Sequence, residues 1–105
     1  ENPFDLRRMW ELVQTMLRDS VHAMVRLDPK LAHEVCDRDA QINEHKRRIR
    51  LLAEELIQQN PSQTRPLLAL AAAARNLERI ADHATNIAED VIYLAEGRIP
   101  RHQRS

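Results

Sequence analysis

Hydrophobic residues recur every three or four positions along three long segments of the chain. In the first segment, this seam consists of Leu6, Met9, Val13, Met16, Ser20, Ala23 and Leu27. Such spacing places the side chains along one face of an α-helix, where they form a narrow buried stripe. Because Pro3 suits a first helical turn, the pattern predicts a first helix over residues 3–26.

The pair Asp28-Pro29 separates this segment from the next one. Asp28 is a suitable N-cap and Pro29 a suitable first helical residue. A seven-residue repeat then follows, with the members Val35, Ile42, Ile49 and Leu56. Its companion positions are less regular, and they consist of Ala32, Asp39, Lys46 and Ala53. The pattern predicts a second helix over residues 29–59, which ends before Asn60-Pro61 and carries Asp39 on the buried seam or at its edge.

The third segment has the longest regular seam. Its members are Leu67, Leu70, Ala74, Leu77, Ala81, Ala84, Ala88, Val91 and Ala95. It predicts a third helix from residue 63 or 66 to residue 96, with Gly97 as the stop signal. Residues 61–66 are expected to form a loop or the first turn of this helix. Since short connections make neighbouring helices antiparallel, the fold class is all-α, an elongated antiparallel three-helix bundle that forms one domain over residues 1–105.

Ile80, Ile87 and Leu94 form a second apolar line on the third helix. One interpretation is that another bundle packs here, supplied by a second copy or by a further part of a longer chain. The other interpretation is a broad arc that faces the core of this same bundle. The first interpretation predicts a homo-oligomer when the chain stands alone.

Composition excludes several classes of partner. The chain has 16 basic and 16 acidic residues, so we expect no nucleic-acid binding. The basic run Lys46-Arg47-Arg48 with Arg50 is interpreted as a solvated helix face.

Cys36 is the only cysteine, which suits a reducing compartment. No apolar run is long enough to span a membrane and no signal peptide is visible, so the expected location is cytoplasmic, without direct membrane insertion.

Candidate chemistry lies in two pairs of polar residues. Glu78 and Asp82 are one helical turn apart, and Asp39 and Asn43 have the same spacing on the second helix. If these helices pack antiparallel, the two pairs can face each other, and four oxygen donors suit a hard cation such as Mg²⁺, Mn²⁺, Ca²⁺ or iron. Further donors that extend such a site are Asn86, Glu89 and Asp90.

A plainer interpretation of the same carboxylates remains open. Arg75 precedes Glu78 by three residues and Arg79 precedes Asp82 by three. Such pairs on one helix contribute only about 0.2–0.5 kcal/mol each. Enzyme chemistry is disfavoured, because no Glu is followed by His three residues later, no HExxH motif is present and a single Gly cannot form a phosphate-binding loop. The residues therefore argue against these chemistries, and in particular against a carboxylate-bridged metal oxidase.

The third helix reads LERIADHATNIAE over residues 77–89 and DVIYLAEG over residues 90–97. Together with DAQIN over residues 39–43, this sequence resembles the PhoU family of phosphate-signalling regulators, and the chain is most like a single, C-terminal three-helix repeat of that family. The resemblance implies a non-enzymatic regulator of phosphate uptake and signalling. Its implied partners are a phosphate ABC transporter and a sensor histidine kinase.

Some members of the family bind metal clusters through paired acidic motifs. The resemblance therefore implies a metal ion, with iron, Mg, Mn and Zn as candidates, held by Asp39, Asn43, Glu78 and Asp82. Asn43 departs from the acidic form of the motif, which removes one negative charge from the site. The alternative function is a structural helical adaptor or dimerisation module that uses no metal.

Overall fold

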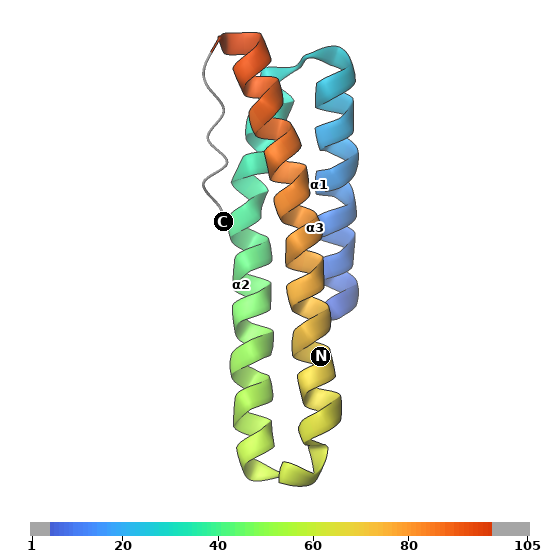
Figure 1. Ribbon diagram of the computed structural model, residues 1–105, viewed down its shortest axis with the longest axis vertical. Coiled ribbons are helices and arrows are strands. Elements are labelled where there is room, and N and C mark those ends of the chain that lie inside the picture. Colours follow the sequence, from blue (N-terminus) through green and yellow to red (C-terminus); the bar gives the residue numbers. More distant parts are fainter. Residues whose placement is uncertain (1–4, 98–105) are drawn as a thin grey trace.

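The computed structural model describes residues 5–97, and these residues form a three-helix bundle without strands. Its elements are α1 (Leu6–Arg26), α2 (Pro29–Gln59), the short 3₁₀ turn η1 (Pro61–Gln63) and α3 (Thr64–Glu96). Helices adjacent in the chain run antiparallel, so α1 and α3 run in the same direction (Figure 1). The molecule measures 53 × 25 × 16 Å, and the predicted all-α bundle is confirmed.

Local hydrogen bonds fix where the helices begin. The Asp5 carboxylate caps α1 by accepting a hydrogen bond of 2.9 Å from the backbone N–H of Arg8. The helix therefore begins at Leu6, later than predicted, while Pro3 lies outside the described residues. Asp28 caps α2 in the same way, because its carboxylate accepts a hydrogen bond of 3.2 Å from the backbone N–H of Leu31. This helix has the predicted bounds because Asp28-Pro29 marks its start and Asn60-Pro61 marks its end.

Leu27 departs from its predicted place in the apolar seam. It is the C-cap of α1, with the left-handed backbone angles φ 51° and ψ 52°, and its side chain is about half exposed. The next residue, Asp28, donates its backbone N–H to the carbonyl oxygen of Ala23 at 2.9 Å. The chain must reverse within two residues at this point, so turn geometry overrides the seam, whose last buried member is Ala23.

The α2–α3 connection is a tight, locally bonded turn. Asn60 donates its N–H to the carbonyl oxygen of Leu56 at 2.9 Å, and the Thr64 hydroxyl donates to the carbonyl oxygen of Pro61 at 2.6 Å. Helix α3 therefore begins at Thr64, between the two predicted starts, with Pro66 in its first turn. At its other end, Gly97 adopts a φ of 75° and donates its backbone N–H to the carbonyl oxygen of Tyr93 at 2.7 Å, as expected for a helix stop.

The core combines larger side chains on α1 and α2 with small ones on α3. The central buried residues are Met9, Val13, Met16, Val35, Ile42, Ile49, Ala74, Ala81, Ala84, Ala88 and Val91. Alanines on α3 let the other two helices approach closely, because an Ala side chain adds little width. Two buried hydroxyls bond to their own helix: Ser20 to the Leu17 carbonyl and Thr85 to the Asp82 carbonyl, both at 2.8 Å.

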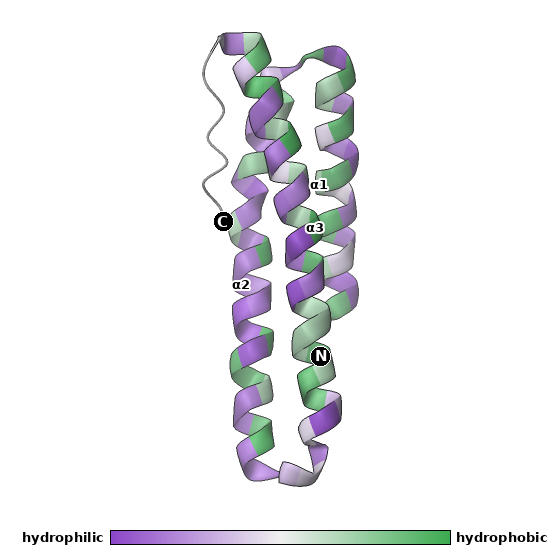
Figure 2. Cartoon of the chain, viewed as in Figure 1, coloured by the Kyte–Doolittle hydropathy of each residue, from purple (hydrophilic) through white to green (hydrophobic). Residues whose placement is uncertain are grey.

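The three helices differ in length, and this leaves one end of the bundle two-helical. Helix α1 has 21 residues, whereas α2 has 31 and α3 has 33. At about 1.5 Å per residue, the α2–α3 hairpin extends roughly 15 Å past the start of α1 (Figure 1). Hydrophilic residues predominate along α2, and hydrophobic residues are more frequent on α3 (Figure 2). Within residues 5–97, no helix combines the length and the apolar character needed to cross a membrane.

Candidate functional site

The α2 half of the predicted site is built from Asp39 and Asn43 on successive turns. Asp39 is only 5 % exposed, as its position on the α2 seam predicted. The Asn43 side-chain nitrogen donates a hydrogen bond of 3.3 Å to Asp39 Oδ2. The Asn43 amide thus turns its NH₂ group, not its oxygen, toward Asp39. The two predicted ligands on α2 therefore bind each other.

The α3 half of the site consists of Glu78 and Asp82, which are both partly buried. Glu78 Oε2 lies 3.3 Å from the ammonium nitrogen of Lys46 on α2. This contact joins the two helices directly. The carbonyl oxygen of Asp82 accepts the hydroxyl of buried Thr85, so the backbone of this turn is also engaged. Sequence reasoning found Glu78 and Asp82 but did not pair Glu78 with Lys46.

Two contacts fix the register of α2 against α3. They are the Lys46–Glu78 pair and a distance of 3.5 Å between His33 Nε2 and Glu96 Oε2. One helical turn from the Lys46–Glu78 pair, in the direction of the His33–Glu96 contact, Asn43 on α2 lies at the same height along the bundle as Asp82 on α3.

A further turn brings Asp39 level with Asn86. Each carboxylate is thus matched with an amide at its own level. We call these six residues the α2–α3 polar face: Asp39, Asn43, Lys46, Glu78, Asp82 and Asn86.

The polar face brings the four predicted ligands to one side of the bundle but not to one point. Among residues 5–97, no three His, Cys, Asp or Glu side chains gather closely enough to hold a metal ion. Hard cations such as Mg²⁺ and Ca²⁺ need several oxygen donors directed at one centre. Metal binding at Asp39, Asn43, Glu78 and Asp82 therefore stays a prediction.

A second polar contact joins α1 to α2. Arg38 Nη1 lies 2.8 Å from Asp19 Oδ2, and Arg18 also reaches the Asp19 carboxylate at 3.3 Å. Burial acts to raise the pKa of Asp19, but the hydrogen bonds and positive charges of Arg38 and Arg18 outweigh it and lower this pKa below its usual value. Asp19 is therefore ionised at neutral pH and fixes α1 against α2.

The basic run on α2 splits between two environments. Arg47 pairs with Glu44 at 3.1 Å and Arg50 with Glu54 at 3.5 Å, each on the surface of its own helix. These arginines lie on the solvated surface expected of the run. Lys46 does not, because it is partly buried and crosses to α3. Its neighbour His45 is partly buried as well, and burial together with the charge of Arg48 lowers the pKa of its imidazole.

An apolar line runs along the exposed side of α1, and the sequence analysis did not identify it. Its members are Trp10, Leu17, Val21 and Met24. They are spaced by seven, four and three residues, so they share one helix face. They lie roughly half a helical turn away from Asp19, which faces α2. The spacing was visible in the sequence, but a single seam had been assigned to the first helix.

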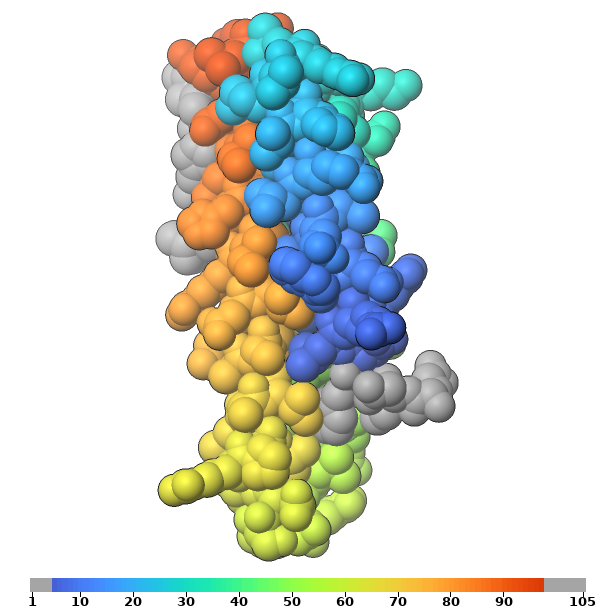
Figure 3. Space-filling view, turned by 90° about the vertical axis from the view of Figure 1, so that its right-hand side faces the viewer, coloured from blue at the N-terminus to red at the C-terminus, as the bar shows by residue number. Residues whose placement is uncertain are grey.

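The second apolar line of α3 borders the same side of the bundle. Ile80, Ile87 and Leu94 lie roughly half a turn away from Glu78, which faces α2. Ile80 and Ile87 are partly buried, and Leu94 is exposed. Helices α1 and α3 lie side by side on the surface in Figure 3. We call this surface the α1–α3 apolar face; it comprises Trp10, Leu17, Val21, Met24, Ile80, Ile87 and Leu94.

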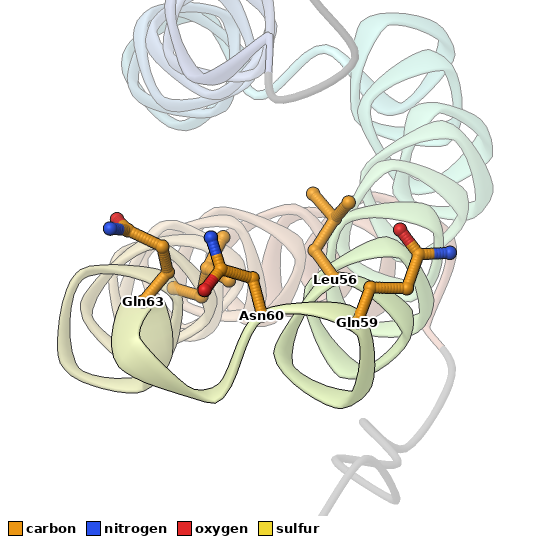
Figure 4. Close-up of a pocket in the computed structure, with 5 residues that line it drawn as sticks. Leu56, Gln59, Asn60 and Gln63 are labelled. Carbon is orange, nitrogen blue, oxygen red and sulfur yellow. The ribbon is translucent and has the colours of Figure 1, made fainter.

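A pocket of about 300 Å³ lies at the tip of the α2–α3 hairpin (Figure 4). Its lining consists of Leu56, Gln59, Asn60, Gln63 and Leu67. Amide side chains surround an apolar base, and no side chain in this lining can titrate. The pocket shares no residue with the polar face, and its lining offers no group for acid–base chemistry.

The fold and its surfaces define an all-α helical-bundle module with a polar face on α2 and α3 and an apolar face on α1 and α3. A model of the PhoU domain matches residues 6–91. The chain belongs to the PhoU family, which confirms the resemblance carried by the third helix.

Similar proteins include the phosphate-specific transport system accessory protein PhoU homologs of Pseudomonas putida, Pseudomonas aeruginosa and Rhizobium meliloti. They are 39 %, 37 % and 30 % identical over 99 residues, which cover 93 %, 93 % and 94 % of this chain. The matched regions make up 38 %, 40 % and 42 % of these relatives, so the chain spans well under half of their length. No solved structure matches the chain.

Proposed function

We propose that the chain is a non-enzymatic accessory module that regulates phosphate uptake and phosphate-dependent signalling. In this proposal it binds a phosphate ABC transporter, its sensor histidine kinase, or both. Membership of the PhoU family and the names of the relatives as transport-system accessory proteins support the role. A cytoplasmic location belongs to the same proposal, because the lone Cys36 suits a reducing compartment.

The observation that carries the proposal is the separation of two surfaces on one small bundle. The α1–α3 apolar face is the kind of surface that associates with another protein. The α2–α3 polar face lies on a different pair of helices and stays available when the apolar face is covered. A module with one face for assembly and another for a partner suits regulation by binding.

We assign the α1–α3 apolar face to a second copy of this chain. Two parallel helices with apolar lines of matching length form a regular surface that a two-fold axis can pair with itself. The relatives are more than twice as long as this chain. Each of them is therefore long enough to hold a second unit of the same size. For the 105-residue chain alone, a second copy supplies that unit.

Sedimentation velocity across a range of concentrations tests the assignment. Wild type should form a dimer, and a Leu17→Asp/Val21→Asp variant should be monomeric, because two carboxylates cannot be buried in an apolar contact. Leu68→Asp is the matched control, since Leu68 is also exposed but lies at the other end of α3. A wild-type monomer at all concentrations would exclude the dimer.

We assign the α2–α3 polar face to the transporter. The test measures binding of the labelled chain to the detergent-solubilised phosphate transporter of Pseudomonas putida, with that organism's own accessory protein as positive control. Asn43→Arg should weaken binding at least tenfold. Gln41→Arg adds the same charge on the opposite side of α2, where Gln41 is also exposed, and should bind normally. Equal affinity of the two variants would remove the polar face from the proposal.

The alternative function is a structural helical adaptor that only dimerises. The exposed apolar line of α1 favours it as much as it favours a regulator. The two functions differ in one outcome: an adaptor forms the dimer but binds neither the transporter nor the kinase. A stable dimer without either interaction would therefore replace the regulatory proposal with the adaptor.

A further inference from the structure

Lys46 differs from the other basic residues of its run in the partner that it selects. Arg47 and Arg50 pair with acidic residues one turn away on α2 itself. Lys46 instead contacts Glu78 on α3, with 3.3 Å between Nζ and Oε2. It therefore contributes a positive charge between two helices, at one end of the row of predicted metal ligands.

The Lys46–Glu78 pair is also better shielded from solvent. Its side chains are 34 % and 19 % exposed, compared with 55 % and 50 % for the Arg47–Glu44 pair. Solvent and salt screen exposed charges more strongly than partly buried ones. The cross-helix pair therefore contributes more to stability than the pairs on the α2 surface.

Three of the predicted metal ligands, Asp39, Asn43 and Glu78, are engaged with other groups of the protein. The resemblance to metal-binding relatives implies oxygen donors that converge, but Glu78 directs an oxygen at an ammonium group. Asn43 directs its NH₂ group at Asp39, and an amide NH₂ is a donor that does not coordinate a cation. A metal ion at Glu78 would have to share that carboxylate with Lys46 or displace the ammonium group from it.

We infer that Lys46 takes the place of a metal ion on the α2–α3 polar face. Its ammonium group neutralises Glu78 and holds α3 against α2, so this three-helix unit needs no divalent cation to keep the two helices together. The inference goes beyond the proposed function, because it concerns how the face is held and not what binds to it.

The experiment compares variants of the 105-residue chain by urea and thermal unfolding, with EDTA or with added Mn²⁺ or Zn²⁺. Wild type should unfold at the same midpoint in all conditions. Lys46→Met should lower the folding equilibrium constant about fivefold, and Lys46→Arg should restore it, since Arg keeps the charge. Arg50→Met removes the same charge from a pair on the α2 surface and should change the constant less than about twofold.

The Mn²⁺ response distinguishes a substitute cation from an ordinary ion pair. If Lys46 stands in for a metal, Mn²⁺ should raise the midpoint of Lys46→Met and leave Lys46→Arg unchanged. Glu78→Gln, which leaves the lysine in place, should show no response and serves as a second variant if Lys46→Met folds poorly. A wild-type midpoint that falls in EDTA, or a Glu78-dependent metal content in purified wild type, would overturn the inference. So would a Lys46→Met variant that ignores Mn²⁺.

Discussion

The Arg38–Asp19 contact between α1 and α2 predicts a large coupling energy for an ion pair. Its atoms are 2.8 Å apart, and its side chains are only 25 % and 15 % exposed. A hydrogen bond to a charged group contributes about 1.5–3 kcal/mol, and partial exposure places this one at the lower end. Asp19→Asn should therefore lower the free energy of unfolding by about 1.5 kcal/mol, because Arg38 keeps a weaker, neutral acceptor.

A double-mutant cycle isolates the interaction from other effects of the substitutions. Asp19→Asn, Arg38→Met and the double variant are unfolded in urea at pH 7, and the coupling energy is calculated from the three losses. The control cycle uses Glu44→Gln and Arg47→Met, whose side chains are about half exposed. The control pair should show a clearly smaller coupling, because solvent screens it.

The pH dependence gives the same contact a second test. The folded-state pKa of Asp19 lies below its usual value of 3.8. The contact therefore stabilises the protein fully above that value, and the stabilisation is lost as the pH falls through the lower folded-state pKa. The difference between wild type and Asp19→Asn should stay constant from pH 7 to pH 5 and shrink below pH 4. A coupling no larger than that of the control pair, or a difference that persists at pH 2, would refute this reasoning.

Three further substitutions test the core and the helix ends by urea unfolding at pH 7. Met16→Ala should cost about 2–4 kcal/mol, because Met16 is fully buried and leaves a cavity; a loss below 1 kcal/mol would contradict the described core. Ala84→Leu should cost about 1–3 kcal/mol by overpacking the close approach on α3, whereas Leu at exposed Ala69 should be neutral; equal effects would contradict that packing. Asp28→Ala should cost about 1 kcal/mol through the lost N-cap, and an unchanged midpoint would show that the cap contributes nothing.

The bounds of α2 were predictable because their signals are local. Asp28 and Pro29 lie next to each other in the chain and act within one turn, so α2 begins where the sequence predicted. The burial of Asp39 also followed from its place in the seven-residue repeat. Leu27 was assigned to the seam by its spacing alone, and the seam could not show that the chain reverses there.

The contacts between helices were not predictable in the same way. Helical periodicity shows which side of a helix is buried, but it does not set the register between two helices. The pairs Lys46–Glu78 and Arg38–Asp19 depend on that register, so neither was found. For the same reason, the predicted metal ligands share a face as expected, yet they lie on three successive levels along the bundle.

The two-helical end of the bundle has a consequence for how the protein opens. Past the start of α1, the hairpin has few buried apolar side chains, among them Ala53 and Leu67. Regions with little buried apolar surface open locally at a lower free energy than the whole domain. Backbone amides near the η1 turn should therefore exchange with deuterated water well before those around Met16 and Ala84. The two-helical end should thus open locally, whereas the part covered by all three helices should open only on global unfolding.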